Sequence, residues 1–172
     1  MSPSRELALA VGGCAGGAGL AWYAASRTWL VVVQPQPVPL PTQSHEVTGA
    51  ALSGWLPALA LAAFAGAAAL LAVRGAGRLL VGALLGGAGV GMIVATMVVR
   101  VSSAGAGGSI GWPVLCVAGG VLVLGAGAAT LWRGRNWPAM GARYERAGRA
   151  TVEPTAQLWD ALDRGDDPTL RG

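Results

Sequence analysis

Charged residues are scarce in this chain of 172 residues, at 12% of the total, while 53% of the residues are hydrophobic. Soluble domains carry roughly 25% charged residues, so the composition excludes an ordinary soluble domain and indicates a membrane protein. The basic residues are all arginine.

Side chains that carry chemistry are equally scarce. The single histidine, His45, stands beside Glu46, and nearby exposed segments offer no further metal ligands, so we expect a solvated pair and no metal site. No phosphate-binding, nucleophile-elbow or CxxC motif occurs. The sequence therefore predicts no catalytic residues, no cofactor and no enzymatic activity, and we expect no nucleic-acid partner.

Only two cysteines are present, Cys14 and Cys116, and both fall within apolar runs. At about 1.5 Å rise per residue, their depths in a bilayer differ by about 13 Å. A disulfide requires Cα atoms within about 7 Å of each other, so we interpret both cysteines as small packing residues.

Long apolar runs without any charged residue dominate the chain. Four of them have the length of one membrane pass, at residues 7–26, 53–73, 79–99 and 112–132. The sequence therefore predicts an all-α integral membrane protein with a four-helix transmembrane bundle. We expect a membrane domain over residues 1–132 and a cytoplasmic tail over residues 133–172.

The distribution of arginine predicts the orientation. Arg74 and Arg78 lie between the second and third runs, and five arginines follow within residues 133–149, whereas the other side keeps only Arg27 and Arg100. By the positive-inside rule both termini are cytoplasmic, and residues 27–52 and 100–111 face outward. The competing interpretation, that the first run is a cleaved signal peptide ending near WYAAS, is disfavoured by its weak charged start and its long, glycine-dense apolar run.

Tryptophans mark the expected membrane boundaries. We assign four of them to an aromatic belt at the outer interface and two to the inner one: Trp22, Trp29, Trp55 and Trp112, then Trp132 and Trp137.

Glycines recur at four-residue spacing within the runs. Lipid provides no hydrophobic attraction between helices, so close approach at such glycines predicts tight helix packing and leaves homo-oligomerisation open. The pairs are Gly12 and Gly16, Gly13 and Gly17, Gly82 and Gly86, and Gly87 and Gly91.

The outer loop at residues 27–52 has strand-like features. Residues 29–33 are β-branched or aromatic, the prolines over residues 35–41 disfavour helix, and HEVTG at residues 45–49 suits a returning strand. We expect a small extended or β-like loop, and because an isolated hairpin is marginal in water, we expect it to lie on the helix ends.

Arg27 and Arg100 are candidate outer-mouth cations. They would hold the carboxylate of a small substrate or, alternatively, lipid phosphates. The four runs contain no ionisable carboxylate, histidine or basic residue, which disfavours ion-coupled transport.

The tail changes charge along its length. Its basic part, residues 133–149, is expected to contact the anionic inner leaflet at about 1 kcal/mol per basic residue. The arginines concerned are Arg133, Arg135, Arg143, Arg146 and Arg149.

The acidic part, residues 151–172, favours a short amphipathic helix with Leu158, Trp159 and Leu162 on one face. An anionic leaflet repels such a segment. Docking of these three residues on a cytosolic protein partner is the preferred hypothesis, and packing on the basic part or disorder are the alternatives.

Four stretches carry a resemblance: SRTW after the first run, LPALALAAFAGAAALLA in the second, RNWPAMGARY after the fourth and LWDALDRGDDPT near the end. In this order they resemble the actinobacterial family of tryptophan-operon-associated membrane proteins, over essentially the whole chain. The resemblance implies a multi-pass protein of the bacterial plasma membrane that is encoded among tryptophan biosynthesis genes.

Two functions follow as hypotheses. The first is a non-enzymatic accessory or scaffolding membrane protein whose tail docks a partner. The alternative is a small facilitator or transporter component for tryptophan, indole or a precursor.

Overall fold

The computed structural model describes residues 3–34, 36–37, 41–73, 75–103 and 108–134. Four helices are long and apolar enough to cross a membrane: α1 (Pro3–Ala25), α3 (Trp55–Ala72), α4 (Ala76–Ser102) and α5 (Gly111–Arg133). A short helix α2 (Gly49–Leu52) and the strands β1 (Thr28–Gln34) and β2 (Gln43–Thr48) lie between α1 and α3. The predicted four-helix bundle with a small β-like loop is confirmed.

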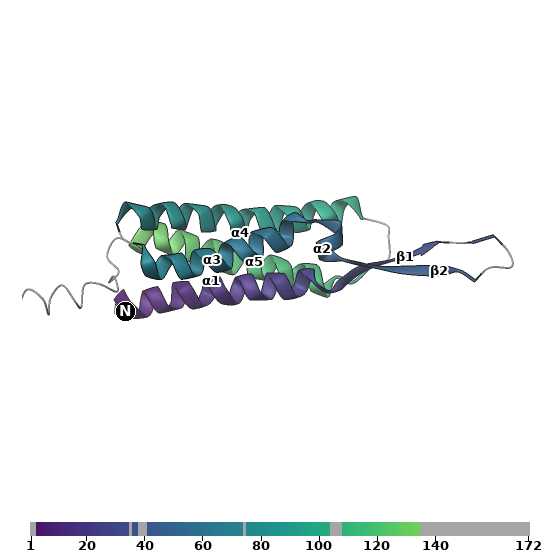
Figure 1. Ribbon diagram of the computed structural model, residues 1–172, viewed down its shortest axis with the longest axis horizontal. Helices are drawn as coiled ribbons and strands as arrows, with labels where there is room; N and C mark the ends of the chain where they lie inside the picture. The colour runs from purple at the N-terminus through teal and green to yellow at the C-terminus, as the bar shows by residue number, and fades with distance from the viewer. Residues whose placement is uncertain (1–2, 35, 38–40, 74, 104–107, 135–172) are drawn as a thin grey trace, which may run out of the picture. The chain divides into compact units, whose positions relative to one another are not determined.

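The four long helices run alternately up and down the bundle in chain order (Figure 1). Each packs on two others: α1 and α4 both contact α3 and α5. The start of α1 and the end of α5 lie at one end, called here the terminal end, and the strands extend from the opposite hairpin end. An even number of antiparallel helices therefore brings the start of α1 and the end of α5 to the same end of the bundle.

Helix α4 extends beyond the predicted apolar run at both ends, over Ala76–Ser102 instead of residues 79–99. The extensions contain Arg78 and Arg100, the charged residues that flank the apolar run at residues 79–99. Hydropathy locates the hydrocarbon layer, whereas backbone hydrogen bonds continue the helix into the headgroup region.

Helix α3 buries mainly small residues and exposes large ones. Three of the five buried residues of α3 are alanines, Ala60, Ala63 and Ala67, whereas Leu61 and Phe64 are exposed. In lipid, exposed apolar side chains cost nothing, and small inward residues allow the helices to approach closely.

Glycines of α5 make the closest helix contacts. A Cβ atom added at Gly119 would lie 2.5 Å from the carbonyl oxygen of Gly17 on α1, and one added at Gly127 would lie 2.6 Å from the amide nitrogen of Gly86 on α4. These are backbone atoms, so only glycine fits there. The α5 glycines were absent from the predicted pairs.

The predicted pairs themselves are used unevenly. Added Cβ atoms at Gly17 and Gly82 would meet α5, whereas those at Gly12 and Gly16 would meet no described atom within 4 Å. Spacing of four residues places both members of a pair on one helix face but does not say which face packs.

The loop after α1 is an antiparallel hairpin, with Leu30 opposite Val47 and Val32 opposite His45. Its strands project away from the helix ends (Figure 1), so the expectation that the hairpin lies on them is wrong. The base is fastened instead: Leu30 bridges Gly108, and the Ser109 amide donates to the Trp29 carbonyl at 3.0 Å.

Trp29 belongs to the core and not to the aromatic belt, which corrects the assignment made from the sequence. Its side chain is 2% exposed, and its Nε1–H donates to the Ala24 carbonyl at 2.9 Å. The ring lies against Gly49, where an added Cβ would approach it to 2.4 Å. Trp22, Trp55 and Trp132 are exposed, as anchoring at an interface requires.

Candidate functional site

A buried arginine, Arg78, joins three helices at the terminal end. Its guanidinium donates to the Gly134 carbonyl at the end of α5 at 2.9 Å and to the Leu70 carbonyl near the end of α3 at 3.4 Å, and the residue is 2% exposed. A helix C-terminus carries unsatisfied carbonyls and partial negative charge, which a cation stabilises. The sequence had suggested only an orienting role for Arg78.

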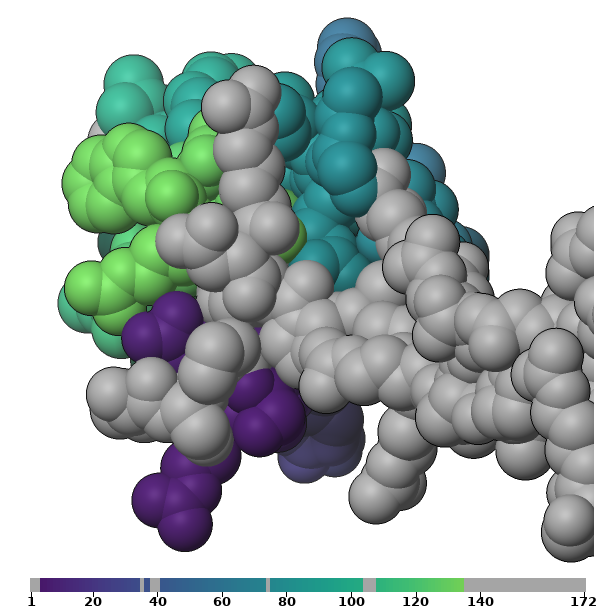
Figure 2. All heavy atoms as spheres, turned by 90° about the vertical axis from the view of Figure 1, so that its left-hand side faces the viewer, coloured from purple at the N-terminus to yellow at the C-terminus, as the bar shows by residue number. Residues whose placement is uncertain are grey.

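The start of α1 and the end of α5 are also joined at this end. The Arg133 guanidinium lies 3.2 Å from the Glu6 carboxylate, and the Arg133 side chain is 67% exposed. Figure 2 shows these two helix ends beside each other, in purple and green. The Arg133 side chain thus already has a carboxylate partner. Its contact with lipid stays a prediction.

At the hairpin end, Arg27 is held by aromatic residues. Its guanidinium carbon lies 4.3 Å from the centre of the Tyr23 ring and 5.7 Å from that of Trp112. The Nη2 group of Arg27 also donates a hydrogen bond to the Tyr23 hydroxyl. The two rings meet edge to face at 5.9 Å between centroids. Cation–π contacts of this kind hold the arginine at the junction of α1 and α5.

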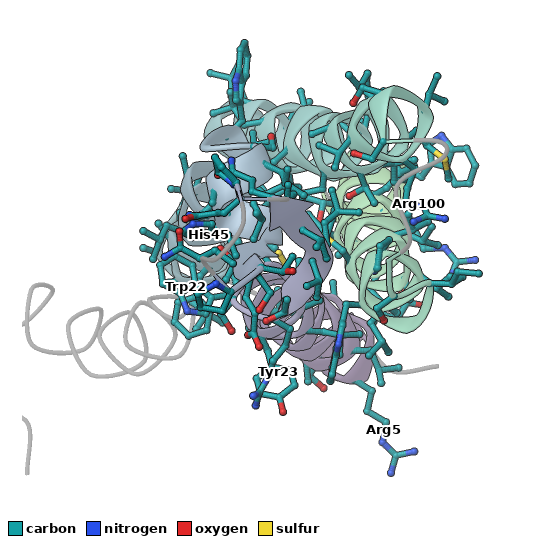
Figure 3. All side chains as sticks on the ribbon, turned by 90° about the vertical axis from the view of Figure 1, so that its right-hand side faces the viewer. Arg5, Trp22, Tyr23, His45 and Arg100 are labelled. Atoms are coloured by element: carbon teal, nitrogen blue, oxygen red, sulfur yellow. The ribbon has the colours of Figure 1, made fainter. Side chains whose placement is uncertain are left out.

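Arg100 lies elsewhere on the same end. It lines a cleft between α4 and α5, with Thr96 and Pro113 among the other walls. Figure 3 shows Arg100 and Tyr23 on separate sides of the bundle end, and Arg27 stacks on Tyr23. The structure thus places the two candidate cations in two different surroundings.

Polar groups inside the bundle are bonded to nearby backbone. The Cys14 thiol donates to the Ala63 carbonyl at 3.3 Å, and the Thr130 hydroxyl donates to the Ala126 carbonyl at 2.7 Å. The Thr96 hydroxyl donates to the Met92 carbonyl at 2.8 Å and lies 3.4 Å from the Cys116 sulfur. Both thiols are free and fully buried. The two cysteines lie on different helices and pack there as separate residues.

His45 is exposed on β2 of the hairpin, whose strands extend from the helix ends (Figure 1). The neighbouring Glu46 carboxylate accepts a hydrogen bond from the Thr28 hydroxyl at 3.0 Å, across the two strands. Within the described ranges, no three histidine, cysteine or carboxylate side chains are grouped closely enough to hold a metal ion.

Residues 11–169 match the family model of the tryptophan-associated transmembrane protein. The chain belongs to this family. No curated protein sequence and no solved structure gives a significant match.

Membership of the tryptophan-associated transmembrane proteins agrees with four helices able to span a membrane, so this is a multi-pass membrane protein. The tryptophan-associated transmembrane protein family is not a known enzyme family. The match also includes most of the tail. The tail residues predicted to act there lie outside the described part of the chain: Arg135, Arg143, Arg146, Arg149, Leu158, Trp159 and Leu162.

Proposed function

We propose that this tryptophan-associated transmembrane protein is a non-enzymatic accessory protein of the bacterial plasma membrane that positions a cytosolic partner through its tail. The observation that supports the proposal is backbone-to-backbone packing along α5. The Gly119 contact with α1 and the Gly127 contact with α4 bring these helices together without intervening side chains.

Such packing suits an anchor better than a carrier. A polar solute needs a path lined by groups that replace its water, and polar groups at membrane depth mark such paths. Here the interior hydroxyls of Thr96 and Thr130 are already bonded to the carbonyls of their own helices. The clefts between described helices are lined mainly by apolar residues and open on the outside of the bundle.

The proposal includes an orientation with the terminal end in the cytoplasm. Arg78 and Arg133 lie at this end, and the arginine-rich segment 135–149 follows directly in the sequence. Cytoplasmic segments that flank membrane helices are enriched in arginine and lysine.

We expect a cysteine placed on the hairpin, in Ser44→Cys, to react with a membrane-impermeant maleimide on intact cells. Ser44 is exposed, and the natural Cys14 and Cys116 are fully buried, so background labelling of the unchanged chain should be low. The measurement is the labelled fraction before and after the cells are opened. Labelling that appears only after opening would reverse the proposed orientation.

We expect a chain that ends at Ala150 to lose capture of its cytosolic partner from native membranes. Trp159→Ala alone should reduce crosslinking by at least about tenfold, because a buried aromatic anchor contributes about 2 kcal/mol or more to many interfaces. The measurement is quantitative crosslinking followed by affinity capture.

The matched control is Gln157→Ala, two positions from Trp159 and on the opposite face of the predicted helix. Capture by this variant should be unchanged. Equal capture by the full and shortened chains would eliminate tail docking. The alternative of a facilitator would then be tested by tryptophan flux across the membrane of a deletion strain. The flux would be compared between cells given the unchanged protein and cells given the double variant Arg27→Ala and Arg100→Ala.

A further inference from the structure

A cleft between α4 and α5 at the hairpin end has a polar rim and an apolar interior. It has a volume of about 240 Å³. Thr96, Met97 and Arg100 line it from α4, and Ile110, Pro113, Val114 and Val117 line it from the side of α5. At roughly 30 Å³ for a water-sized group, the cleft holds about eight such groups, which suits part of one acyl chain.

The depth of Arg100 places the rim of this cleft at the headgroup level. Arg78 and Arg100 are separated by 100 − 78 = 22 positions of α4, which span about 33 Å at 1.5 Å per residue. This length is close to the roughly 30 Å of a hydrocarbon core. The exposed rings of Trp22 and Trp55, near the hairpin ends of α1 and α3, agree with an interface at this level.

The charge at the rim has no neutralising group nearby in the described part of the chain. Two acidic residues lie in the described part of the chain: Glu6, at the terminal end, pairs with Arg133, and Glu46, on β2, accepts a hydrogen bond from Thr28. Arg27, in contrast, lies on two aromatic rings. A guanidinium that faces a membrane at headgroup level is complementary to a phosphate, which it binds through two parallel N–H donors.

We infer that the α4–α5 cleft is a binding site for one anionic glycerophospholipid. In this proposal the phosphate binds the guanidinium of Arg100, the residue labelled in Figure 3, and part of one acyl chain fills the apolar cleft beside Met97 and Val114. The walls contain few polar atoms that would hold water, whereas an acyl chain supplies the contacts they lack. The site is separate from the tail and does not depend on the docking proposal.

The test is native mass spectrometry of the full chain in mild detergent. The protein is titrated with phosphatidylglycerol or with phosphatidylcholine that carries identical acyl chains. We expect the first phosphatidylglycerol to bind about tenfold more tightly. Its phosphate keeps a net negative charge for the guanidinium, whereas the choline ammonium of phosphatidylcholine neutralises the phosphate within the same headgroup. Arg100→Gln should abolish this preference.

Arg27→Gln is the matched control, because it removes the same charge at the same end of the bundle. It should keep the preference. Val114→Trp fills the cleft from a position that is 58% exposed, so it should not disturb the core. It should weaken the first lipid of either kind while Arg100 remains.

Three results would overturn the site. These are equal affinity for the two lipids, an unchanged preference in Arg100→Gln, and an unchanged first lipid in Val114→Trp. Inorganic phosphate tests a simple anion site. Displacement of the first lipid by millimolar phosphate would show that the acyl chain is not recognised, whereas retention supports the lipid site. Unfolding midpoints of the variants within a few degrees of the parent would show that any loss is local.

Discussion

Replacement of Gly119 by leucine should prevent α1 and α5 from packing and should destabilise the bundle by more than about 3 kcal/mol, above the usual range for an overpacked core. The first carbon of the new side chain would lie 2.5 Å from the Gly17 carbonyl oxygen and 2.9 Å from the Ala21 amide nitrogen. These atoms are in the backbone of α1 and cannot rotate away, so the two helices must separate. Denaturation in detergent micelles, followed by circular dichroism, measures the loss.

Gly125→Leu is the control for this experiment. It lies on the same helix, introduces the same side chain, and its added Cβ would meet no described atom within 4 Å. The free energy of unfolding should change by no more than about 0.5 kcal/mol, as for most surface substitutions. If the two leucine variants unfold together, the close contact at Gly119 does not stabilise the bundle.

Replacement of Arg78 by methionine should cost about 3 kcal/mol of stability. Methionine has a similar length but cannot donate to the Gly134 and Leu70 carbonyls, and each hydrogen bond to a charged group contributes about 1.5–3 kcal/mol. Loosening should concentrate at the terminal end, so protease sensitivity and hydrogen exchange near the ends of α3 and α5 should increase along with the global loss.

Two comparisons separate this role from simple charge. Arg78→Lys keeps the orienting charge but replaces the planar fork by one ammonium, so it should restore only part of the stability. Arg133→Met removes an exposed ion pair and should cost less than about 1 kcal/mol. A lysine variant as stable as the parent would mean that charge alone matters at position 78.

The sequence alone was sufficient for the number of helices long enough to span a membrane and for the hairpin. Four runs without charge can satisfy their backbone groups in lipid only as helices, so their existence follows from composition and length. The β-branched residues after α1 and the prolines that follow them likewise exclude a helix there. Both features depend on neighbours in the chain, which the sequence displays directly.

The roles of particular residues were decided by tertiary structure. The glycines at positions 119 and 127, the buried Arg78 and the buried Trp29 have no local pattern that separates them from an exposed glycine, an orienting arginine or an interfacial tryptophan. Their roles depend on how each helix is rotated about its axis, and that rotation is set by the fit of all the helices together.

The same limit applies to the candidate sites. Arg27 and Arg100 are similar in sequence, since each follows an apolar run at the hairpin end. Only the packed bundle places one on Tyr23 and Trp112 and the other at the rim of a cleft. Composition thus determined that this protein crosses a membrane with four helices, because transfer into lipid depends on each segment by itself. Contacts between helices determined where a ligand has room to bind, because a cleft belongs to no single segment.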